Sequence, residues 1–139
     1  MVTVYRILGA LALLIVTYVA TIFIASESGG EVVELFRPSE DGRIDIVRVW
    51  IVDAGDGAMI EHGAPDDAWM KQLTVKPTLK LRRQDQVTTY NARLAPKRHS
   101  EYHKLRREKY GFSDRLIDWL SFKNAATCTG VPLYLSPKS

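Results

Sequence analysis

The chain has 139 residues, of which 46% are hydrophobic and 25% are charged, and its formal net charge is +3. This length suits one domain of ordinary size. The single cysteine, Cys128, excludes an internal disulfide and leaves the redox compartment undetermined.

The charge is distributed unevenly along the chain. From Glu27 to Asp67 there are eleven acidic and three basic residues, whereas from Ala68 to the end there are fifteen basic and five acidic residues. A basic half suggests an anionic partner such as a phosphate group, an acidic lipid or a nucleic acid. The alternative is a solvated surface whose two halves attract each other in the fold. Nucleic acid is disfavoured, because aromatic residues are not interleaved with the basic ones in a stacking pattern.

The nineteen residues 7–25 are all uncharged, and this apolar segment predicts a transmembrane helix. At about 1.5 Å per residue this helix is roughly 28 Å long, close to the hydrocarbon thickness of a bilayer. A cleaved signal peptide is the main rival, since Ser26 and Ser28 place small residues two apart before Gly29. A buried core helix is the third interpretation. The apolar region of a signal peptide usually has about 7–15 residues, which favours an uncleaved single-pass anchor. Basic residues flank both ends, so the side of the membrane stays undetermined.

The rest of the chain predicts short strands with inserted helices. Residues 26–30 are expected to form a linker, which divides the chain into an anchor segment, 1–28, and a soluble domain, 29–139. The Asp41-Gly42 pair is a strong hairpin signal, and Gly111 suits the end of a helix. Antiparallel strands of this length predict a mainly β fold, a small barrel with helices. The expected strands are 31–37, 44–52, 58–62, 78–83, 87–94 and 130–137, and the expected helices are 65–76, 96–111 and 114–122.

No complete protein-only active site is evident. His99 and His103 have the spacing of a metal-binding pair, but no glutamate lies between them and their surroundings are basic. They are therefore interpreted as part of a solvated helical face, and no metal site is predicted. Cys128 has no evident base beside it, and Asp66-Asp67 is interpreted as the cap of a helix. Any catalysis therefore requires a cofactor that performs the chemistry.

Residues 31–136 resemble a known family in the order of their motifs. A strand, the Asp-Gly turn, a strand containing Val-Trp, a short strand, the helix pattern G-x-P-x-x-x-W-x-x-x-L over 63–73 and the strand P-T-L-K-L over 77–81 follow one another. This order is similar to the FMN-binding split barrel of the pyridoxamine-phosphate-oxidase-like superfamily, nearest to its deazaflavin-dependent nitroreductase relatives. The segment 107–120 is similar to the helical insertion common before the last strand of these relatives.

The resemblance implies a six-stranded antiparallel split β-barrel with short inserted helices, which follows the N-terminal transmembrane helix. It implies FMN or a deazaflavin bound between the two protomers of a homodimer, in a groove edged by the second and third strands and the following helix. Arg48 falls near an arginine that contacts the cofactor, and Glu61, His62 and Gly63 fall alongside its ring. The cofactor residues expected from the resemblance and its surroundings are Arg48, Trp50, Glu61, His62, Gly63, Trp69 and Lys71.

The sequence departs from the family at three positions. Asp67 and Trp69 stand where oxidase-like members place phosphate-binding residues, and Asp53 stands where a second cofactor lysine is expected. Lys71, Arg82 or Arg83 is a hypothetical source of the missing positive charge. Trp50 and Trp69 also have an alternative interpretation as packing residues.

Two functions remain open. The first is a membrane-anchored redox protein that passes hydride or electrons to a small acceptor such as a quinone. The second is a membrane-tethered barrel without a cofactor, which binds a ligand or partner without catalysis. The missing phosphate-binding residues favour the second function, whereas the order of motifs favours the first.

Overall fold

Six antiparallel strands close into a barrel in the structure, a computed structural model that describes residues 2–122 and 126–138. The order of the strands around the barrel is β1-β2-β3-β6-β5-β4. This confirms the six-stranded antiparallel barrel expected from the sequence. The elements are α1 (Val2–Ser28), β1 (Val32–Pro38), β2 (Ile44–Ala54), β3 (Gly57–Glu61), α2 (Ala68–Val75), β4 (Thr78–Arg83), β5 (Gln86–Leu94), the 3-10 turn η1 (Pro96–Arg98), α3 (His99–Ser121) and β6 (Pro132–Pro137).

The long strand β2 joins the two parts of the barrel. Its first part, from Ile44 to Trp50, pairs with β1, and its last part, from Ile51 to Ala54, pairs with β3. The hairpin between β1 and β2 turns at Gly42, whose positive φ of 81° is readily adopted by glycine. The expected Asp-Gly turn is therefore present.

The core lies inside the barrel and under α2. Alternate residues of each strand point inward, as the two-residue period of a strand requires. Trp69, Met70 and Leu73 of α2 are buried against this core. The inward-facing strand residues include Val33, Leu35, Val49, Ile51, Leu79, Leu81, Leu133 and Leu135.

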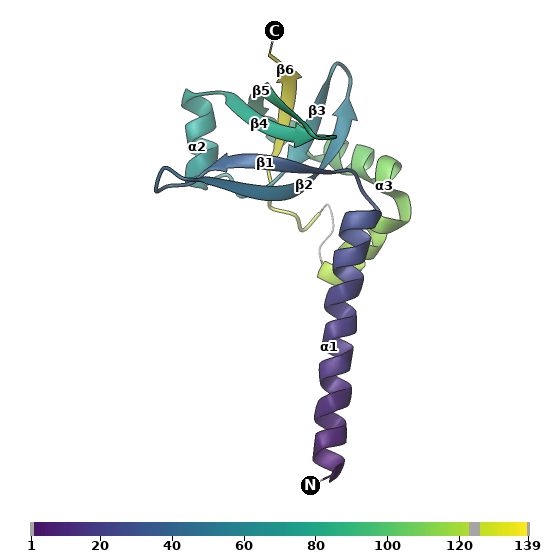
Figure 1. Cartoon of the computed structure of the whole chain (residues 1–139). Coiled ribbons are helices and arrows are strands. Elements are labelled where there is room, and N and C mark those ends of the chain that lie inside the picture. Colours follow the sequence, from purple (N-terminus) through teal and green to yellow (C-terminus); the bar gives the residue numbers. More distant parts are fainter. Residues whose placement is uncertain (1, 123–125, 139) are drawn as a thin grey trace.

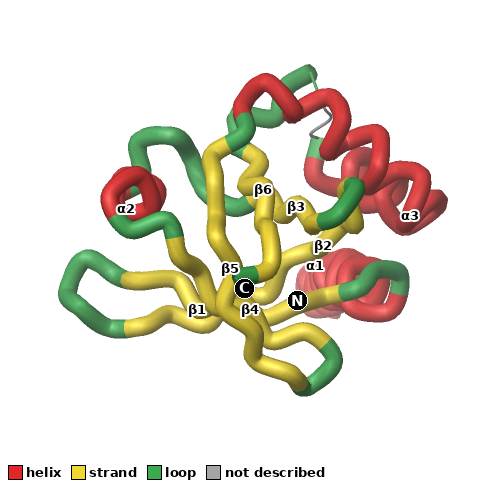
Figure 2. The backbone as a smooth tube through the Cα atoms, turned by 90° about the horizontal axis from the view of Figure 1, so that it is seen from above, coloured by secondary structure: helices red, strands yellow, loops and turns green. Residues whose placement is uncertain are grey.

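Helix α3 covers the barrel on the side away from α2 (Figure 2). Tyr102 and Tyr110 of α3 pack on a second apolar cluster, formed with Val52, Ala54 and Met59 of the barrel. The chain continues helical from His99 to Ser121, but Gly111 has non-helical angles of φ 51° and ψ −110° and kinks the helix. The two helices expected on either side of Gly111 thus form one kinked helix, because the glycine bends the chain without ending it.

Helix α1 projects away from the barrel (Figure 1). Its segment Val4–Ile24 has 21 residues and a mean hydropathy of 2.6, and it is long and apolar enough to cross a membrane. None of that segment is buried (0%), which does not fit a core helix. The helix continues to Ser28, so the expected linker at 26–30 is helical in its first part.

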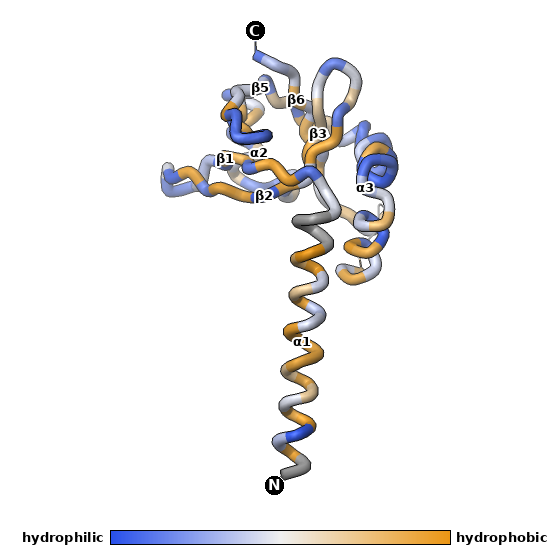
Figure 3. The backbone as a smooth tube through the Cα atoms, turned by 45° about the vertical axis from the view of Figure 1, so that its right-hand side comes forward, coloured by the Kyte–Doolittle hydropathy of each residue, from blue (hydrophilic) through white to orange (hydrophobic). Residues whose placement is uncertain are grey.

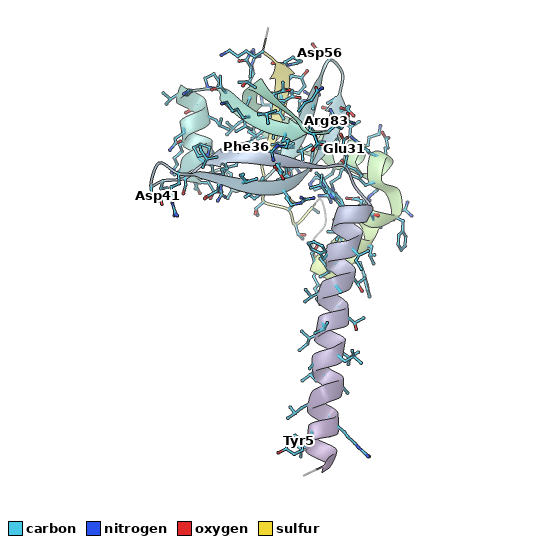
Figure 4. All side chains as sticks on the ribbon, viewed as in Figure 1. Tyr5, Glu31, Phe36, Asp41, Asp56 and Arg83 are labelled. Carbon is cyan, nitrogen blue, oxygen red and sulfur yellow. The ribbon has the colours of Figure 1, made fainter. Side chains whose placement is uncertain are left out.

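The acidic and basic halves of the chain meet in the fold. Arg82 of β4 donates to Glu34 of β1 at 2.6 Å, and Arg83 donates to Glu31 at 2.6 Å. Figure 4 shows Arg83 and Glu31 close together at the barrel edge near the top of α1. These pairs agree with the interpretation that the two halves attract each other.

Candidate functional site

Two hollows adjoin each other where the β1–β2 hairpin meets α2, and both are bordered by Pro38. The first, called here the acidic pocket, has a volume of about 370 Å³. The second, called the basic groove, has a volume of about 540 Å³. The acidic pocket is lined by Arg37, Pro38, Ser39, Glu40, Asp45, Asp66, Asp67, Ala68 and Trp69.

The acidic pocket contains one cation among four carboxylates. Arg37 donates to Asp45 at 2.9 Å, and its other terminal nitrogen lies 3.3 Å from His62 Nε2. Burial of His62, followed by the positive charge of Arg37, lowers the pKa of this imidazole. His62 is therefore neutral at pH 7, and its Nε2 can accept a hydrogen bond from the Arg37 guanidinium. The excess of negative charge does not fit a phosphate.

The turn at Gly63 shapes the wall of this pocket. Gly63 has a φ of 89°, and a Cβ there would lie 2.5 Å from Asp67 Oδ2 and 3.0 Å from Trp69 Nε1. Asp67 occupies the N-cap position of α2 but makes no side-chain cap; its Oδ2 accepts a hydrogen bond from Ala64 N at 2.9 Å. The expected capping by the Asp67 side chain is therefore wrong, because the turn presents the Ala64 amide to it.

The buried indole of Trp69 borders the same turn. Its ring lies 6.0 Å from that of His62, centroid to centroid, and packs in the barrel core. Among the described residues, its Nε1 has no hydrogen-bond partner. Trp69 is thus both a core residue and part of the pocket lining.

The basic groove combines an apolar floor with a cationic rim. Leu73 and Leu79 are buried beneath it, and Phe36 lies 5.5 Å from the guanidinium carbon of Arg82. Lys76 and Lys80 are exposed at its edge. The lining contains cations but no carboxylate. It consists of Phe36, Pro38, Ile44, Gln72, Leu73, Lys76, Thr78, Leu79, Lys80, Arg82, Val87 and Thr89.

The structure separates the seven cofactor residues expected from the sequence. His62, Gly63 and Trp69 lie together beside the acidic pocket. Arg48 is exposed and stands opposite Glu34 in the β1–β2 register. Lys71 is exposed on α2 and borders neither hollow.

Two further expected residues face α3. The Trp50 ring lies 4.7 Å from that of Tyr110, which makes it a packing residue between β2 and α3. The Glu61 side chain lies near His99, His103 and Cys128. The expected solvated face at His103 is wrong, because only 8% of this residue is exposed.

Arg82 and Arg83, which the sequence suggested as sources of positive charge for a phosphate, form ion pairs with carboxylates. Arg82 pairs with Glu34, while Arg83 bonds Glu31 and, at 2.9 Å, Asp53. The Arg83 hydrogen bond lowers the pKa of both Glu31 and Asp53, so both carboxylates remain charged at neutral pH. Arg83 therefore lies in an ion-pair network rather than in the basic groove.

The cluster of Glu61, His99, His103 and Cys128 is the part of the molecule that sequence reasoning missed. The four-residue spacing of His99 and His103 was the feature of the sequence that could have indicated this cluster. Glu61 and Cys128 join them only because β3 pairs with β6, which places Glu61 opposite Pro132. This pairing brings together residues 67 positions apart.

Comparisons with known proteins support the fold. No protein-family model and no curated protein matches the sequence. The structure is similar to that of the heme storage protein HutZ from Vibrio cholerae, with a TM-score of 0.52 and 10% identity, covering 86% of this chain and 89% of that one. It is similar to an F420-H2 dependent reductase, with a TM-score of 0.51 and 14% identity, covering 76% of this chain and 94% of that one.

A third similar structure is a putative 5-nitroimidazole antibiotic resistance protein from Bacteroides thetaiotaomicron, with a TM-score of 0.52 and 7% identity, covering 79% of this chain and 74% of that one. These likenesses show the split β-barrel fold, as the sequence motifs predict. One fold carries different functions, so these likenesses do not by themselves assign a function to this chain.

Proposed function

We propose that this protein is a membrane-anchored oxidoreductase that binds FMN or a deazaflavin coenzyme in the basic groove. The carrying observation is the combination of an apolar floor and a cationic rim in a groove of about 540 Å³. Ligand pockets for molecules of this size are mostly apolar and have a few polar groups that fix the orientation. The F420-H2 dependent reductase with the same fold supports the deazaflavin alternative.

The chemistry of the two hollows supports placing the cofactor in the basic groove. Both candidate cofactors carry a fused aromatic ring system and at least one phosphate. Leu73 and Leu79 offer an apolar surface to the ring, and Lys76 and Lys80 offer charge-assisted hydrogen bonds to the phosphate. The acidic pocket offers four carboxylates, which repel the same phosphate.

The residues of the chain supply binding and orientation, while the bound ring supplies the hydride or electrons. His62 and Arg37 border the neighbouring pocket and offer hydrogen bonds to an acceptor held beside the ring. His62, Gly63 and Trp69 are therefore proposed to lie beside the bound acceptor. Arg48, Trp50, Glu61 and Lys71 are not part of the proposed site, since they line neither hollow.

The test is a binding titration of the detergent-purified full chain with FMN and with coenzyme F420, followed by ring fluorescence. The double variant Lys76→Gln/Lys80→Gln is expected to weaken binding at least about tenfold, because each charged hydrogen bond contributes about 1.5–3 kcal/mol. Lys71→Gln is the matched control on α2 and is expected to bind as the wild type does.

Two outcomes would overturn parts of this proposal. Absence of binding of either cofactor at tens of micromolar excludes the redox function and favours a tethered barrel without catalysis. Loss of binding in His62→Gln, with normal binding in the lysine double variant, moves the cofactor to the acidic pocket. The alternative function has its own support, since Arg82 and Arg83 are paired with carboxylates.

The proposed anchoring rests on α1 and on its neighbour α3. The exposed apolar segment Val4–Ile24 fits a bilayer by length and composition. The end of α3 lies beside α1 and is also apolar, as the orange segments in Figure 3 show. Tethering at the bilayer favours a lipid-soluble acceptor such as a quinone. Resistance of the protein in native membranes to extraction by alkaline carbonate would support anchoring, whereas its release would contradict it.

The homodimer expected from the family resemblance stays a prediction. Ile44 and Ile46 are more than half exposed on β2, and Ile44 borders the basic groove. A second copy covering these residues would close the groove from outside. The mass of the detergent-solubilised protein by light scattering, corrected for detergent, distinguishes the monomer from the dimer.

A further inference from the structure

Four potential metal ligands from three separate parts of the chain converge beside α3. Glu61 ends β3, His99 and His103 lie one turn apart on α3, and Cys128 precedes β6. One ligand atom of each residue lies within 4.8 Å of the ligand atoms of the other three. This cluster lies apart from the acidic pocket and the basic groove, since none of its residues lines either hollow.

Several distances within the cluster, measured to both oxygens of Glu61, are close to the ligand-to-ligand distances of a tetrahedral zinc site. His99 Nε2 lies 3.2 Å from His103 Nε2 and 3.2 Å from Glu61 Oε1. Glu61 Oε2 lies 3.5 Å from His103 Nε2 and 3.3 Å from Cys128 Sγ. Nitrogen, oxygen and sulfur ligands bound tetrahedrally to Zn²⁺ at about 2.0–2.3 Å lie about 3.3–3.6 Å from one another. The side chains therefore need only small movements to surround one ion.

The Glu61 carboxylate is buried, and one of its two oxygens lacks a hydrogen bond. Its side chain is 7% exposed, and its Oε1 has no hydrogen-bond partner among the described residues. His99 Nε2 approaches this oxygen at 3.2 Å without forming a hydrogen bond. A buried polar atom without a hydrogen bond is costly, and a cation between the carboxylate and the imidazoles would satisfy this oxygen.

The basic residues around the cluster do not oppose a dication as strongly as the sequence suggests. Arg106 lies near His103 but is paired with Asp114 and Asp118. Other basic side chains of α3 and the preceding turn also have acidic partners. These pairs are Arg98 with Glu101, Lys104 with Glu108, Arg107 with Asp118, and Lys109 with Glu31.

Metal binding requires neutral imidazoles and a deprotonated thiol. Burial lowers the pKa of His103, which keeps its imidazole neutral and able to ligate. Burial raises the pKa of Cys128, whose thiol donates to Glu61 Oε2, so binding would displace this proton. Gly130 leaves room for the carboxylate, since a Cβ there would lie 2.8 Å from Glu61 Cδ.

We infer that Glu61, His99, His103 and Cys128 form a tetrahedral site for a borderline divalent cation of the Zn²⁺ type. Two imidazoles, one carboxylate and one thiolate suit Zn²⁺, whereas Mg²⁺ and Ca²⁺ prefer oxygen ligands alone. Because the protein supplies all four ligands, the site is structural. It ties the start of α3 to the end of β3 and to the segment before β6. This inference replaces the sequence-based prediction of no metal and does not depend on the proposed cofactor.

The experiment uses the full chain, purified in detergent with a chelator and a reducing agent that does not bind metals, and then titrated with Co²⁺. We expect one equivalent to produce the intense visible bands of tetrahedral Co²⁺ and a near-ultraviolet thiolate-to-cobalt charge-transfer band. Zn²⁺ should then displace Co²⁺ and abolish both signals. Cys128→Ser is expected to remove the charge-transfer band specifically.

Affinity is measured by competition with a chromophoric chelator. Loss of a supporting residue around a metal typically costs about 10–100-fold in affinity, and loss of a ligand should cost at least as much. His103→Gln and Glu61→Gln should therefore weaken Zn²⁺ binding at least about tenfold. His99 is less buried, so His99→Gln provides the same test if His103→Gln does not fold. His62→Gln is the matched control, a histidine outside the cluster.

The inference is overturned if wild-type protein gives only the weak bands of octahedral Co²⁺. It is also overturned if the cluster variants and His62→Gln bind Zn²⁺ equally well, which would mean an adventitious ion only. Flavin titration of Glu61→Gln separates the two proposals, because normal cofactor binding is expected in a variant that has lost the metal.

Discussion

The phenol of Tyr18 donates a hydrogen bond of 2.6 Å to the backbone carbonyl of Leu120, a residue 102 positions later. This contact joins the middle of the apolar helix α1 to the end of α3. Tyr18 lies six residues before Ile24, which corresponds to a depth of about 9 Å along the helix. Trp119 and Phe122 beside this contact are 72% and 88% exposed. In the anchored protein, these side chains would reach the interfacial layer of the bilayer, where tryptophan is enriched.

The first prediction concerns whether the end of α3 reaches the bilayer. In vesicles that contain brominated lipids, the tryptophan fluorescence of the protein should be partly quenched, mainly through Trp119. Trp119→Phe should lose most of this quenching, because Trp50 and Trp69 are packed in the domain. Unchanged quenching in this variant would show that the end of α3 does not touch the bilayer.

The second prediction concerns the turn beside Trp69. Gly63→Ala should lower the free energy of unfolding by about 2–4 kcal/mol, from left-handed backbone strain together with overpacking. The added Cβ would meet Asp67 Oδ2 at 2.5 Å. Gly42→Ala is the control, since Gly42 also has a positive φ but has no atom within 4 Å of the added Cβ. Thermal unfolding in detergent should show the larger decrease for Gly63→Ala, and equal decreases would exclude the contribution of overpacking.

The third prediction concerns a buried ion pair in the kinked helix. Asp114 is 1% exposed and accepts hydrogen bonds from Arg106 and Arg107. Arg106→Met should destabilise the fold by about 3 kcal/mol, because it leaves the buried carboxylate without its main partner. The double variant Arg106→Met/Asp114→Asn should recover part of this loss.

The matched control for that pair is Arg43→Met. Arg43 pairs with Asp41 on the hairpin between β1 and β2, where the Arg43 side chain is 78% exposed. Solvent screens such a pair, so no measurable change in stability is expected. A loss equal to that of Arg106→Met would show that burial does not determine the contribution of these pairs.

The fourth prediction concerns acid stability. Arg83 lowers the pKa of Glu31 below its usual 4.5 and that of Asp53 below its usual 3.8. Each folded-state pKa is therefore below the unfolded value, so the stabilisation is present above the unfolded pKa and is lost as pH falls through the folded pKa. Arg83→Gln should weaken the dependence of the unfolding temperature on pH below about pH 5. Glu31→Gln should act in the same direction, and an unchanged pH profile in both variants would contradict the assignment.

Local patterns predicted the strands and the long apolar N-terminal helix correctly in type and place. Alternation of apolar residues and the turn at Gly42 are local properties, so they indicated β1 and β2 without tertiary information. The apolar segment 7–25 could likewise be recognised by length and composition. Gly111 was recognised as an interruption, but whether the chain stopped or kinked there depended on the packing of α3 against the barrel.

The candidate site was less predictable from the sequence, because residues that are adjacent in the chain can face different parts of the domain. Glu61 and His62 are adjacent in the chain, yet Glu61 faces the α3 cluster and His62 faces Arg37 and Trp69. The expected cofactor set therefore combined residues from different sides of the domain. The sequence suggested that Arg82 and Arg83 could bind an anion, but in the structure both pair with acidic residues of the first half of the chain.

The sequence by itself determined the elements of this protein, because periodicity, turn residues and the apolar N-terminal segment act over short distances. Only the tertiary structure decided which side chains meet. Closure of the barrel through the pairing of β3 with β6 brings Glu61 and Cys128 together and sets them against two histidines of α3. No local pattern encodes that proximity, because it arises from the long-range hydrogen bonding of strands that are far apart in the chain.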